Sequence, residues 1–560
     1  MKKVQFNEKN CYSPQKHSDA HNFAAPFIEK PTVGILSSYG WRLKEAPNTK
    51  NLLKPAMSME YFVNCNTAPL APYSAPLDRL RVQHLYRRAG FGASVQTVEQ
   101  ASGQTADQLV DSLIDRALNL PPIPAPDWAT WNRDNYPSDG DLARGVIRTQ
   151  IDVLGLDYTR GLMTNNLRDR LSFFWSNHFV TEIDVYESPA FLYEYVNCLQ
   201  RNALGNFKTF VSEIGLTNAM LYYLDGAFNN GRNPNENYAR ELYELFTLGE
   251  GNGYTEEDVI ETAKALSGYT ERGEVRWTPV TFDVTAFDAG PKTILGQTGN
   301  WGYADVIDIL FQERPQEIAR FICQKLYEFF VHPDSNDSAG NAQTIIAGMA
   351  GTFISNNFEL APVLSELFKS QHFFDDNAVG VIIKSPFDLY LNFINESGFT
   401  CTDSNLSFAR ESSRLLGQEL FDPIDVAGWQ RNRSWINTNF MIGRWLTSEV
   451  LIQGFFQENP EQFRALAMQA VGAANSNTSN PETVVRALVD KFLPKGLLTP
   501  QEFENAMSVF KIEDVPENYY GPDYVDGGLS LWMLAVSMEA PQQVFLLMMH
   551  LSRQPEFQLK

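Results

Sequence analysis

The chain is poor in cysteine. Its 560 residues include only five, Cys11, Cys65, Cys198, Cys323 and Cys401, and they lie far apart. Small secreted scaffolds held by disulfides carry a dense and usually even set of cysteines, and zinc sites need closely spaced pairs. The sequence therefore predicts neither a disulfide framework nor a metal cluster.

Basic residues and long apolar runs are also scarce. The chain has 45 Lys and Arg against 67 Asp and Glu, a net charge of −22. Binding to nucleic acids or to anionic membranes needs a basic face, so we expect no nucleic-acid partner. The apolar run over 529–551 is interrupted by Glu539 and Pro541, and we expect no transmembrane segment. Residues 1–10 lack the apolar core of a signal peptide.

The signatures of common enzyme classes are missing as well. The sequence contains no Gly-x-Ser-x-Gly elbow, no His-Glu-x-x-His zinc motif and no EF-hand spacing. The glycine-rich stretch 249–253 follows a helical pattern and lacks the Lys-Ser/Thr ending of a phosphate-binding loop. We therefore predict no metal site and no cofactor, and leave open whether the protein is an enzyme.

Apolar residues are abundant and mostly follow a helical period. They make up 44% of the chain, ample for a buried core. A Thr105 and Gln108 capping box, for example, precedes a run of apolar residues at helical spacing. Between 274 and 299 the period shortens among Thr, Gly and Pro. The sequence predicts a mainly α, multi-helix globular domain with a small β-hairpin excursion near 274–299.

The division of the chain into an arm and a domain follows from the position at which the helical spacing of apolar residues begins. Residues 1–76 carry scattered Pro, Asn and Ser with little periodicity, which predicts a loosely ordered N-terminal arm. A helix over 78–89 then begins a single large helical domain, 77–560. The Asn- and Ser-rich stretch 473–481 is a candidate sub-boundary within it.

The stretch 235–249 is the most strongly marked part of the chain. Its polar side carries Glu236, Asn237, Arg240, Glu241 and Glu244. Arg240 lies four residues from both Glu236 and Glu244, so two carboxylates can flank one guanidinium. A solvent-facing row would contribute roughly 0.3–0.5 kcal/mol per pair, whereas a buried row would be a structural network or a functional site. We treat Asn237 and Glu244 as candidate binding residues.

His178 is the histidine with the clearest functional alternative. The pattern over 166–179 predicts a helix that places His178 on its apolar face. A lone histidine there is either a core residue or an acid–base group tuned by a nearby carboxylate. The catalytic hypothesis combines His178 with Glu236 or Glu241 as acid–base groups and uses Arg240 to hold an anionic substrate.

Three further features are candidates for binding. Arg87 and Arg88 could hold a carboxylate or phosphate. Alternatively, their positive charges simply stabilise the C-terminal end of their helix by interacting with its dipole. Asn177 could orient a ligand or bond a helix end. Trp429 and Trp435 offer flat apolar faces on which sugar rings stack, although core packing explains them equally well.

Several motifs together carry a family resemblance. They occupy 84–92, 174–179, 235–249, 254–269, 290–296, 384–386, 425–429 and 554–559. In this order they resemble the bacterial family catalogued as domain of unknown function 1800, over roughly residues 77 to 560. The family pattern commonly has histidines where this chain has Ser176 and Phe246, so a histidine-based metal site shared by the family would be lost or rebuilt here.

The resemblance implies a setting rather than an activity. Similar proteins are generally helical, often exported, and often encoded beside members of the family of domain of unknown function 1501. It thus implies a binding protein of the cell envelope or secretion route with a partner from that second family. An exported or periplasmic location would follow, although residues 1–10 show no signal peptide. The alternative is a hydrolase-type enzyme that uses the His/Glu/Arg cluster.

Overall fold

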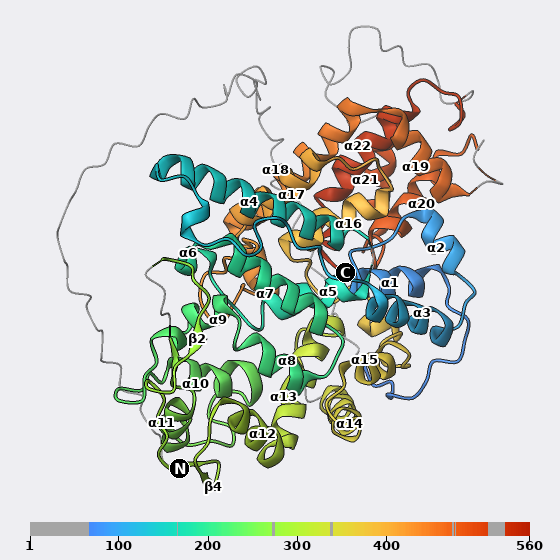
Figure 1. Cartoon of the computed structure of the whole chain (residues 1–560). Coiled ribbons are helices and arrows are strands. Elements are labelled where there is room, and N and C mark those ends of the chain that lie inside the picture. Colours follow the sequence, from blue (N-terminus) through green and yellow to red (C-terminus); the bar gives the residue numbers. More distant parts are fainter. Residues whose placement is uncertain are drawn as a thin grey trace, which may run out of the picture. The chain divides into compact units, whose positions relative to one another are not determined.

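Helices dominate the structure, as the apolar spacing predicts (Figure 1). The computed structural model describes residues 66–560, apart from 165, 271–274, 337–339, 473–474, 476–477 and 513–531. In these ranges there are 22 α-helices. The mainly α fold class is therefore confirmed.

The helices are numbered in chain order. The first eleven are α1 (Arg79–Ala89), α2 (Val95–Ala101), α3 (Ala106–Asn119), α4 (Gly140–Leu162), α5 (Leu167–Ser176), α6 (Ile183–Tyr186), α7 (Pro189–Asn202), α8 (Phe207–Ile214), α9 (Asn218–Tyr223), α10 (Asn237–Glu241) and α11 (Glu256–Ala265). The others are α12 (Tyr303–Glu313), α13 (Pro315–Phe330), α14 (Ala342–Ser355), α15 (Leu360–Phe368), α16 (Pro386–Ser397), α17 (Asp403–Leu415), α18 (Thr438–Glu458), α19 (Glu461–Val471), α20 (Pro481–Phe492), α21 (Pro500–Lys511) and α22 (Ala540–Ser552). The predicted Thr105 and Gln108 capping box opens α3, and Asp78 caps α1.

The predicted β excursion is present as two small antiparallel pairs, and the second is a hairpin within the predicted range. Strand β1 (Tyr269–Thr270) pairs with β2 (Thr281–Phe282), and β3 (Lys292–Ile294) pairs with β4 (Gln297–Gly299). The first pair begins just before the range in which the sequence pattern changes. Each strand has only two or three residues, so these pairs are small additions to a helical fold whose core is built by helices.

Helices α5 and α16 lie deepest in the fold. Every residue of α5 is buried, and so is nearly every residue of α16. A helix buried on all sides belongs to the interior. Both nevertheless carry charged residues, Arg168, Asp169 and Arg170 on α5 and Asp388 and Glu396 on α16. Because a buried charge is costly unless it is paired, these residues fix where the interior ion pairs form.

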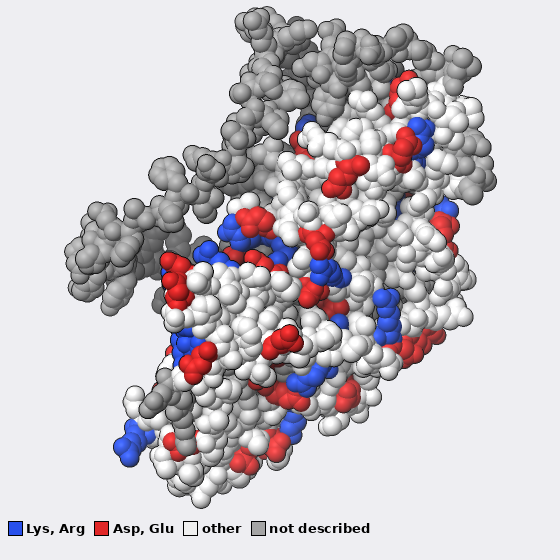
Figure 2. Space-filling view, turned by 45° about the horizontal axis from the view of Figure 1, so that its top comes forward, with Lys and Arg blue, Asp and Glu red and all other residues white. Residues whose placement is uncertain are grey.

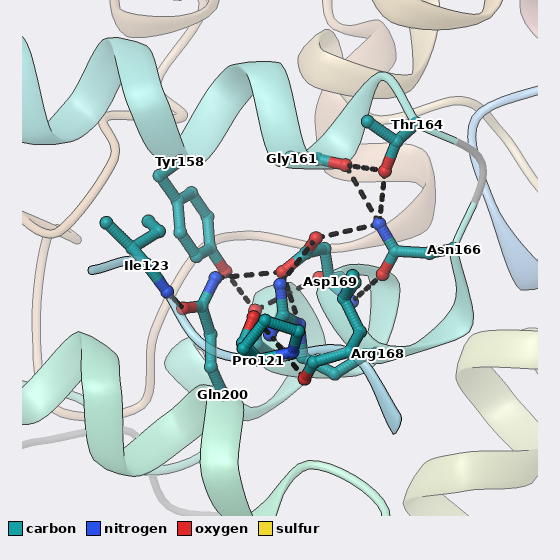
Figure 3. Close-up of polar contacts among 11 residues, drawn as sticks. Pro121, Ile123, Tyr158, Gly161, Thr164, Asn166, Arg168, Asp169 and Gln200 are labelled. Carbon is teal, nitrogen blue, oxygen red and sulfur yellow. Dashed lines mark hydrogen bonds and ion pairs between the residues drawn. The ribbon is translucent and has the colours of Figure 1, made fainter. Parts of the chain in front are cut away.

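One such network ties a proline-rich loop to the core (Figure 3). The fully buried Asp169 accepts a hydrogen bond from Gln200 of α7 at 2.8 Å and pairs with Arg168 at 2.8 Å. Arg168 also donates to the carbonyl oxygen of Pro121, and Gln200 accepts from the N–H of Ile123. The loop is thus held by side chains from two different helices.

Segments distant in sequence pack together throughout this unit, which spans Asn64–Lys560. Helix α3 packs on α5 and α15, and α2 packs on α19. Helix α19 precedes the candidate sub-boundary and packs on α20 and α22, which both follow it. Of the predicted N-terminal arm, residues 1–65 lie outside the described residues. Residues 66–76 hydrogen-bond to the 369–374 segment through Asn66, Tyr73 and their neighbours.

Charged side chains of both signs lie in small groups on the face seen in Figure 2. Figure 2 shows Lys and Arg beside Asp and Glu on one face, with other residues over most of the remaining area. The described residues include exposed ion pairs such as Arg414–Glu411 and Arg160–Asp403, and such pairs typically contribute only about 0–1 kcal/mol. In the described ranges, no helix has both the length and the apolar character that a membrane span requires.

Candidate binding site

The central helix forms the predicted ion pairs close to solvent. Helix α10 continues into a π-helix, Leu242–Thr247, a widened turn that often marks a functional region. Arg240 pairs with Glu236 and Glu244, each at 3.3 Å, and with Glu256 of α11 at 2.7 Å. The side chain of Arg240 is 31% exposed and that of Glu256 is 72% exposed. The row is therefore a partly exposed network, and Glu256 is a member that the sequence pattern did not identify.

The other two polar residues of this helix do not join the network. Asn237 donates a 3.4 Å hydrogen bond to Asp225. Glu241 is partly buried, and its burial, together with the charge of Glu244, raises the pKa of its carboxyl group.

His178 lies in an aromatic environment beyond its helix. Helix α5 ends at Ser176 with Asn177 as its C-cap, so the helix predicted over 166–179 is too long and His178 lies in the following turn. Its Nε2 is 3.0 Å from the carbonyl oxygen of Phe246. The rings around it are Phe174, Trp175, Phe179, Phe207, Phe246 and Phe321.

This environment keeps the imidazole of His178 neutral. Burial, together with the positive charge of Lys325, holds its pKa well below the usual value. Nδ1 has no hydrogen-bond partner, and among the described residues no hydrogen bond joins His178 to a carboxylate. The catalytic set of His178, Glu236, Arg240 and Glu241 stays a prediction that these contacts do not assemble.

The neutral imidazole has a measurable consequence for stability. Below about pH 6.5 the unfolded chain binds a proton at this residue that the folded chain does not, so stability falls by about 1.4 kcal/mol per pH unit. In His178→Gln the amide can still donate to the Phe246 carbonyl. Below pH 6.5 we expect its free energy of unfolding, measured with urea, to fall by about 1.4 kcal/mol less per pH unit than that of wild type. Unfolding above pH 7 is the control, because imidazole is neutral in both states there. An unchanged pH slope would contradict the assignment.

The predicted anion site at Arg87 and Arg88 is filled by the protein itself. Arg87 donates to both carboxylate oxygens of Glu396, at 2.5 and 3.2 Å, and to the carbonyl oxygen of Lys491. Arg88 donates to four main-chain oxygens, those of Phe330, Val331, Ala378 and Lys560. Both arginines are fully buried. They bind a carboxylate and carbonyl groups of the interior.

Three of the predicted binding residues meet at one cavity. Asn177, Trp429 and Trp435 line a space of about 120 Å³ between the end of α5, the end of α13 and the start of α16. Phe173, Phe174 and Phe329 supply further aromatic walls, and Glu328, Asp388, Arg431 and Lys560 supply charge. The volume is that of several water molecules or a single ring-sized ligand.

One wall of this cavity depends on the contact between Asn177 and the Gly428–Trp429 pair. The side-chain oxygen of Asn177 accepts a 2.5 Å hydrogen bond from the N–H of Trp429. Gly428 has φ +88°, a conformation that side chains disfavour, and lies against Asn177. The indole of Trp429 packs at a tilt against Phe173, with ring centroids 5.0 Å apart, and donates to the carbonyl of Glu419. The loop is thereby fixed to the end of α5.

The cavity lining also includes two members of a buried ion triad, Asp388 and Lys560. Asp388 of α16 accepts from Lys560 at 2.5 Å and pairs with Arg170 of α5 at 2.9 Å. Burial alone would raise the pKa of Asp388, but these two cations hold it well below its usual range. The guanidinium of Arg170 lies over the rings of Phe91 and Phe329, and none of its nitrogens makes an aligned hydrogen bond.

The sequence offered little sign of this triad. Its members are distant along the chain: Asp388 and Lys560 are 172 positions apart. The one usable signal was the charged run 168–170 between apolar residues of a helix, which indicates buried charges but not their partners.

These features define a large helical protein with a ring-sized cavity that is lined in part by a buried ion triad. In the described part of the chain, no three His, Cys, Asp or Glu side chains are grouped as metal ligands. The chain belongs to the family described as protein of unknown function (DUF1800), whose model matches residues 84–559. No curated protein and no solved structure matches it.

Proposed function

We propose that the protein is a binding protein whose ligand is a small hydroxylated ring, such as one sugar unit. The observation that carries this proposal is the convergence of Asn177, Trp429 and Trp435 on one cavity. Aromatic rings supply flat apolar faces for the ring carbons, and polar groups at the edge can satisfy hydroxyls.

Several polar side chains that line the cavity have donor groups that the described residues do not use. Asn177 and Gln418 each use the side-chain oxygen within the protein, accepting from the N–H groups of Trp429 and Phe387. Their NH₂ groups, and the indole N–H of Trp435, donate no hydrogen bond to any described residue. Three side chains that line the cavity thus each carry a donor group without an acceptor among the described residues. A ligand rich in hydroxyl oxygens would supply the acceptors.

The family setting belongs to the same proposal. A binding protein of the cell envelope or secretion route would act with a partner, and the family of domain of unknown function 1501 remains the candidate. Co-purification from the native host tests this, and repeated recovery of the protein alone would count against it. The hydrolase alternative has no comparable contacts, because no hydrogen bond connects its proposed acid and base.

Ligand binding can be tested by calorimetry with a panel of neutral monosaccharides and sugar acids. We expect Trp435→Phe to weaken binding at least about tenfold, or about 1.4 kcal/mol, because the smaller ring removes stacking area and the indole donor. Trp301→Phe is the matched control, since Trp301 lies outside the cavity and its indole donates to Gln297. Absence of binding across the whole panel, by correctly folded protein, would refute the proposal.

A further inference from the structure

Lys325 is a lysine whose amine makes no hydrogen bond or ion pair with any described residue. It lies half-buried on α13, with Nζ 4.7 Å from the centre of the Phe321 ring one turn earlier. Lys491 and Lys560, by contrast, donate to a carbonyl oxygen and to a carboxylate. Lys325 therefore has an aromatic face where those two lysines have an acceptor.

The carboxylate of Glu328, three residues further along α13, is engaged with neutral donors. Its Oε1 accepts a hydrogen bond from the side-chain amide of Gln324 at 3.0 Å and another from the hydroxyl of Ser335 at 2.5 Å. Among the described contacts, no ion pair joins Glu328 to Lys325. Glu328 therefore attracts the amine without making a hydrogen bond to it.

Two other neighbours, from outside α13, provide no counterion. Arg431 is a cation and repels the charged form of Lys325. The ring of His178 lies 6.4 Å from that of Phe321. Its Nε2 donates to the carbonyl oxygen of Phe246, so the imidazole is neutral and the buried Nδ1 keeps an unused lone pair. A half-buried amine near a cation and a neutral ring is stabilised in its uncharged form.

The protonation of Lys325 agrees with this geometry. Burial and the charge of Arg431 lower its pKa to about 7, against the opposing attraction of Glu328. At pH 7 about half of the molecules therefore carry the neutral amine, whereas an ordinary lysine has fewer than about one in a thousand in that form. The neutral form is the nucleophile, and loss of solvation beside another cation is a known way of activating a lysine.

We infer that Lys325 is a nucleophilic amine that forms an imine with a small aldehyde, at a site made by Phe321, His178 and Arg431. The nitrogen lone pair attacks the carbonyl carbon, and a C–N bond forms as the C=O bond opens. Both hydrogens of the neutral amine then leave with the carbonyl oxygen as water, so the step needs no oxidant or reductant. Arg431 also lines the cavity described above, but imine formation at Lys325 does not require that a sugar binds there.

Reductive trapping tests this chemistry in the folded, full-length chain. Glycolaldehyde is the probe, and cyanoborohydride reduces each imine to a stable secondary amine that peptide mass spectrometry locates. Lys208 is the matched control for reagent access, because its side chain is 38% exposed and its amine pairs with Asp308 at 2.7 Å. At pH 7 we expect Lys325 to be labelled at least about tenfold faster than Lys208. Labelling of Lys325 at the same rate or more slowly would overturn the inference.

The ratio of the two labelling rates also reports protonation, because the pH dependence of the reagents cancels. Between pH 7 and pH 9 the neutral fraction of Lys325 rises only about twofold, while that of an ordinary lysine rises about tenfold per pH unit. The ratio of Lys325 to Lys208 labelling should therefore fall at least about tenfold over this range. A constant ratio would show that Lys325 is merely accessible, and the nucleophilic site would be excluded.

The variant Arg431→Gln tests the surroundings of the amine. It removes the like charge, so Lys325 should hold its proton more tightly and its labelling at pH 7 should fall about two- to fivefold. The rate at Lys208 should not change. An unchanged or higher rate at Lys325 would remove Arg431 from the site and overturn the assignment. Sugar binding is measured separately on wild type, so failure of imine formation leaves the proposed binding function standing, and the reverse also holds.

Discussion

Replacing Asp388 with asparagine is expected to lower the free energy of unfolding by about 3–5 kcal/mol, the usual cost of breaking a buried ion pair from one side. Asparagine has nearly the same shape, so the loss comes from the charge. Arg170 and Lys560 would remain in the interior without their shared counterion, and both are almost fully buried. Urea unfolding followed by circular dichroism measures the difference.

The pH dependence of this difference has a definite sign. In the folded protein the pKa of Asp388 is held below its usual range, so its contribution is fully present above the unfolded value of about 3.9. It is lost as the pH falls towards the folded value. Wild type and Asp388→Asn should therefore differ most near neutral pH and converge in acid, provided that the chain remains folded there.

An exposed pair supplies the control. Asp403 pairs with Arg160 at 2.7 Å, but the two side chains are 62% and 44% exposed. Asp403→Asn removes one carboxylate from an ion pair in the same way, and should cost only about 0–1 kcal/mol. Equal losses in the two variants would show that burial does not set the energy of the Asp388 triad.

The parts of this structure that could be predicted from sequence are local. The Thr105 and Gln108 capping box involves residues three apart, and the Arg240 ion pairs involve residues four apart. Such spacings determine which side chains meet before any tertiary fold exists. The helical period also identified the fold class, because most of the core comes from amphipathic helices.

Predictions failed where contacts between residues distant in sequence determine the helix ends and the side-chain partners. The helix over 166–179 was extended too far because His178 continues the apolar pattern after the backbone has turned. For Arg87 the sequence left open a bound carboxylate or phosphate and a favourable position at the helix end, but it could not indicate the partner, Glu396, which is 309 positions away. Likewise, nothing in the sequence placed Asn177 next to Trp429. The stacking candidates could be proposed because tryptophan is chemically informative by itself, whereas the charged residues of the cavity lining require coordinates.

The remaining large effect is expected at Gly428, on the wall that joins Asn177 to the tryptophans. In Gly428→Ala the new methyl group would clash with the side-chain oxygen of Asn177 and lie 2.9 Å from its carbonyl oxygen. The carbonyl cannot rotate away as a side chain can, so the 428–429 backbone must move. That movement breaks the hydrogen bond from Trp429 to Asn177. Left-handed strain of about 1–2 kcal/mol and a lost hydrogen bond of about 1 kcal/mol together give a destabilisation of about 2–3 kcal/mol.

The variant Gly103→Ala separates the backbone strain from the loss of the hydrogen bond. Its φ is +86°, and an added methyl group would meet nothing within 4 Å. Gly103→Ala should therefore cost only the strain, about 1–2 kcal/mol, and leave ligand binding unchanged. Gly428→Ala should lose more stability in urea unfolding and weaken sugar binding at least about tenfold, because the Trp429 wall shifts with the backbone. If both variants lose the same stability and bind equally well, the contact between Asn177 and Gly428 does not shape the cavity. A binding defect confined to Gly428→Ala would show that the wall built by this glycine determines the fit of the ligand.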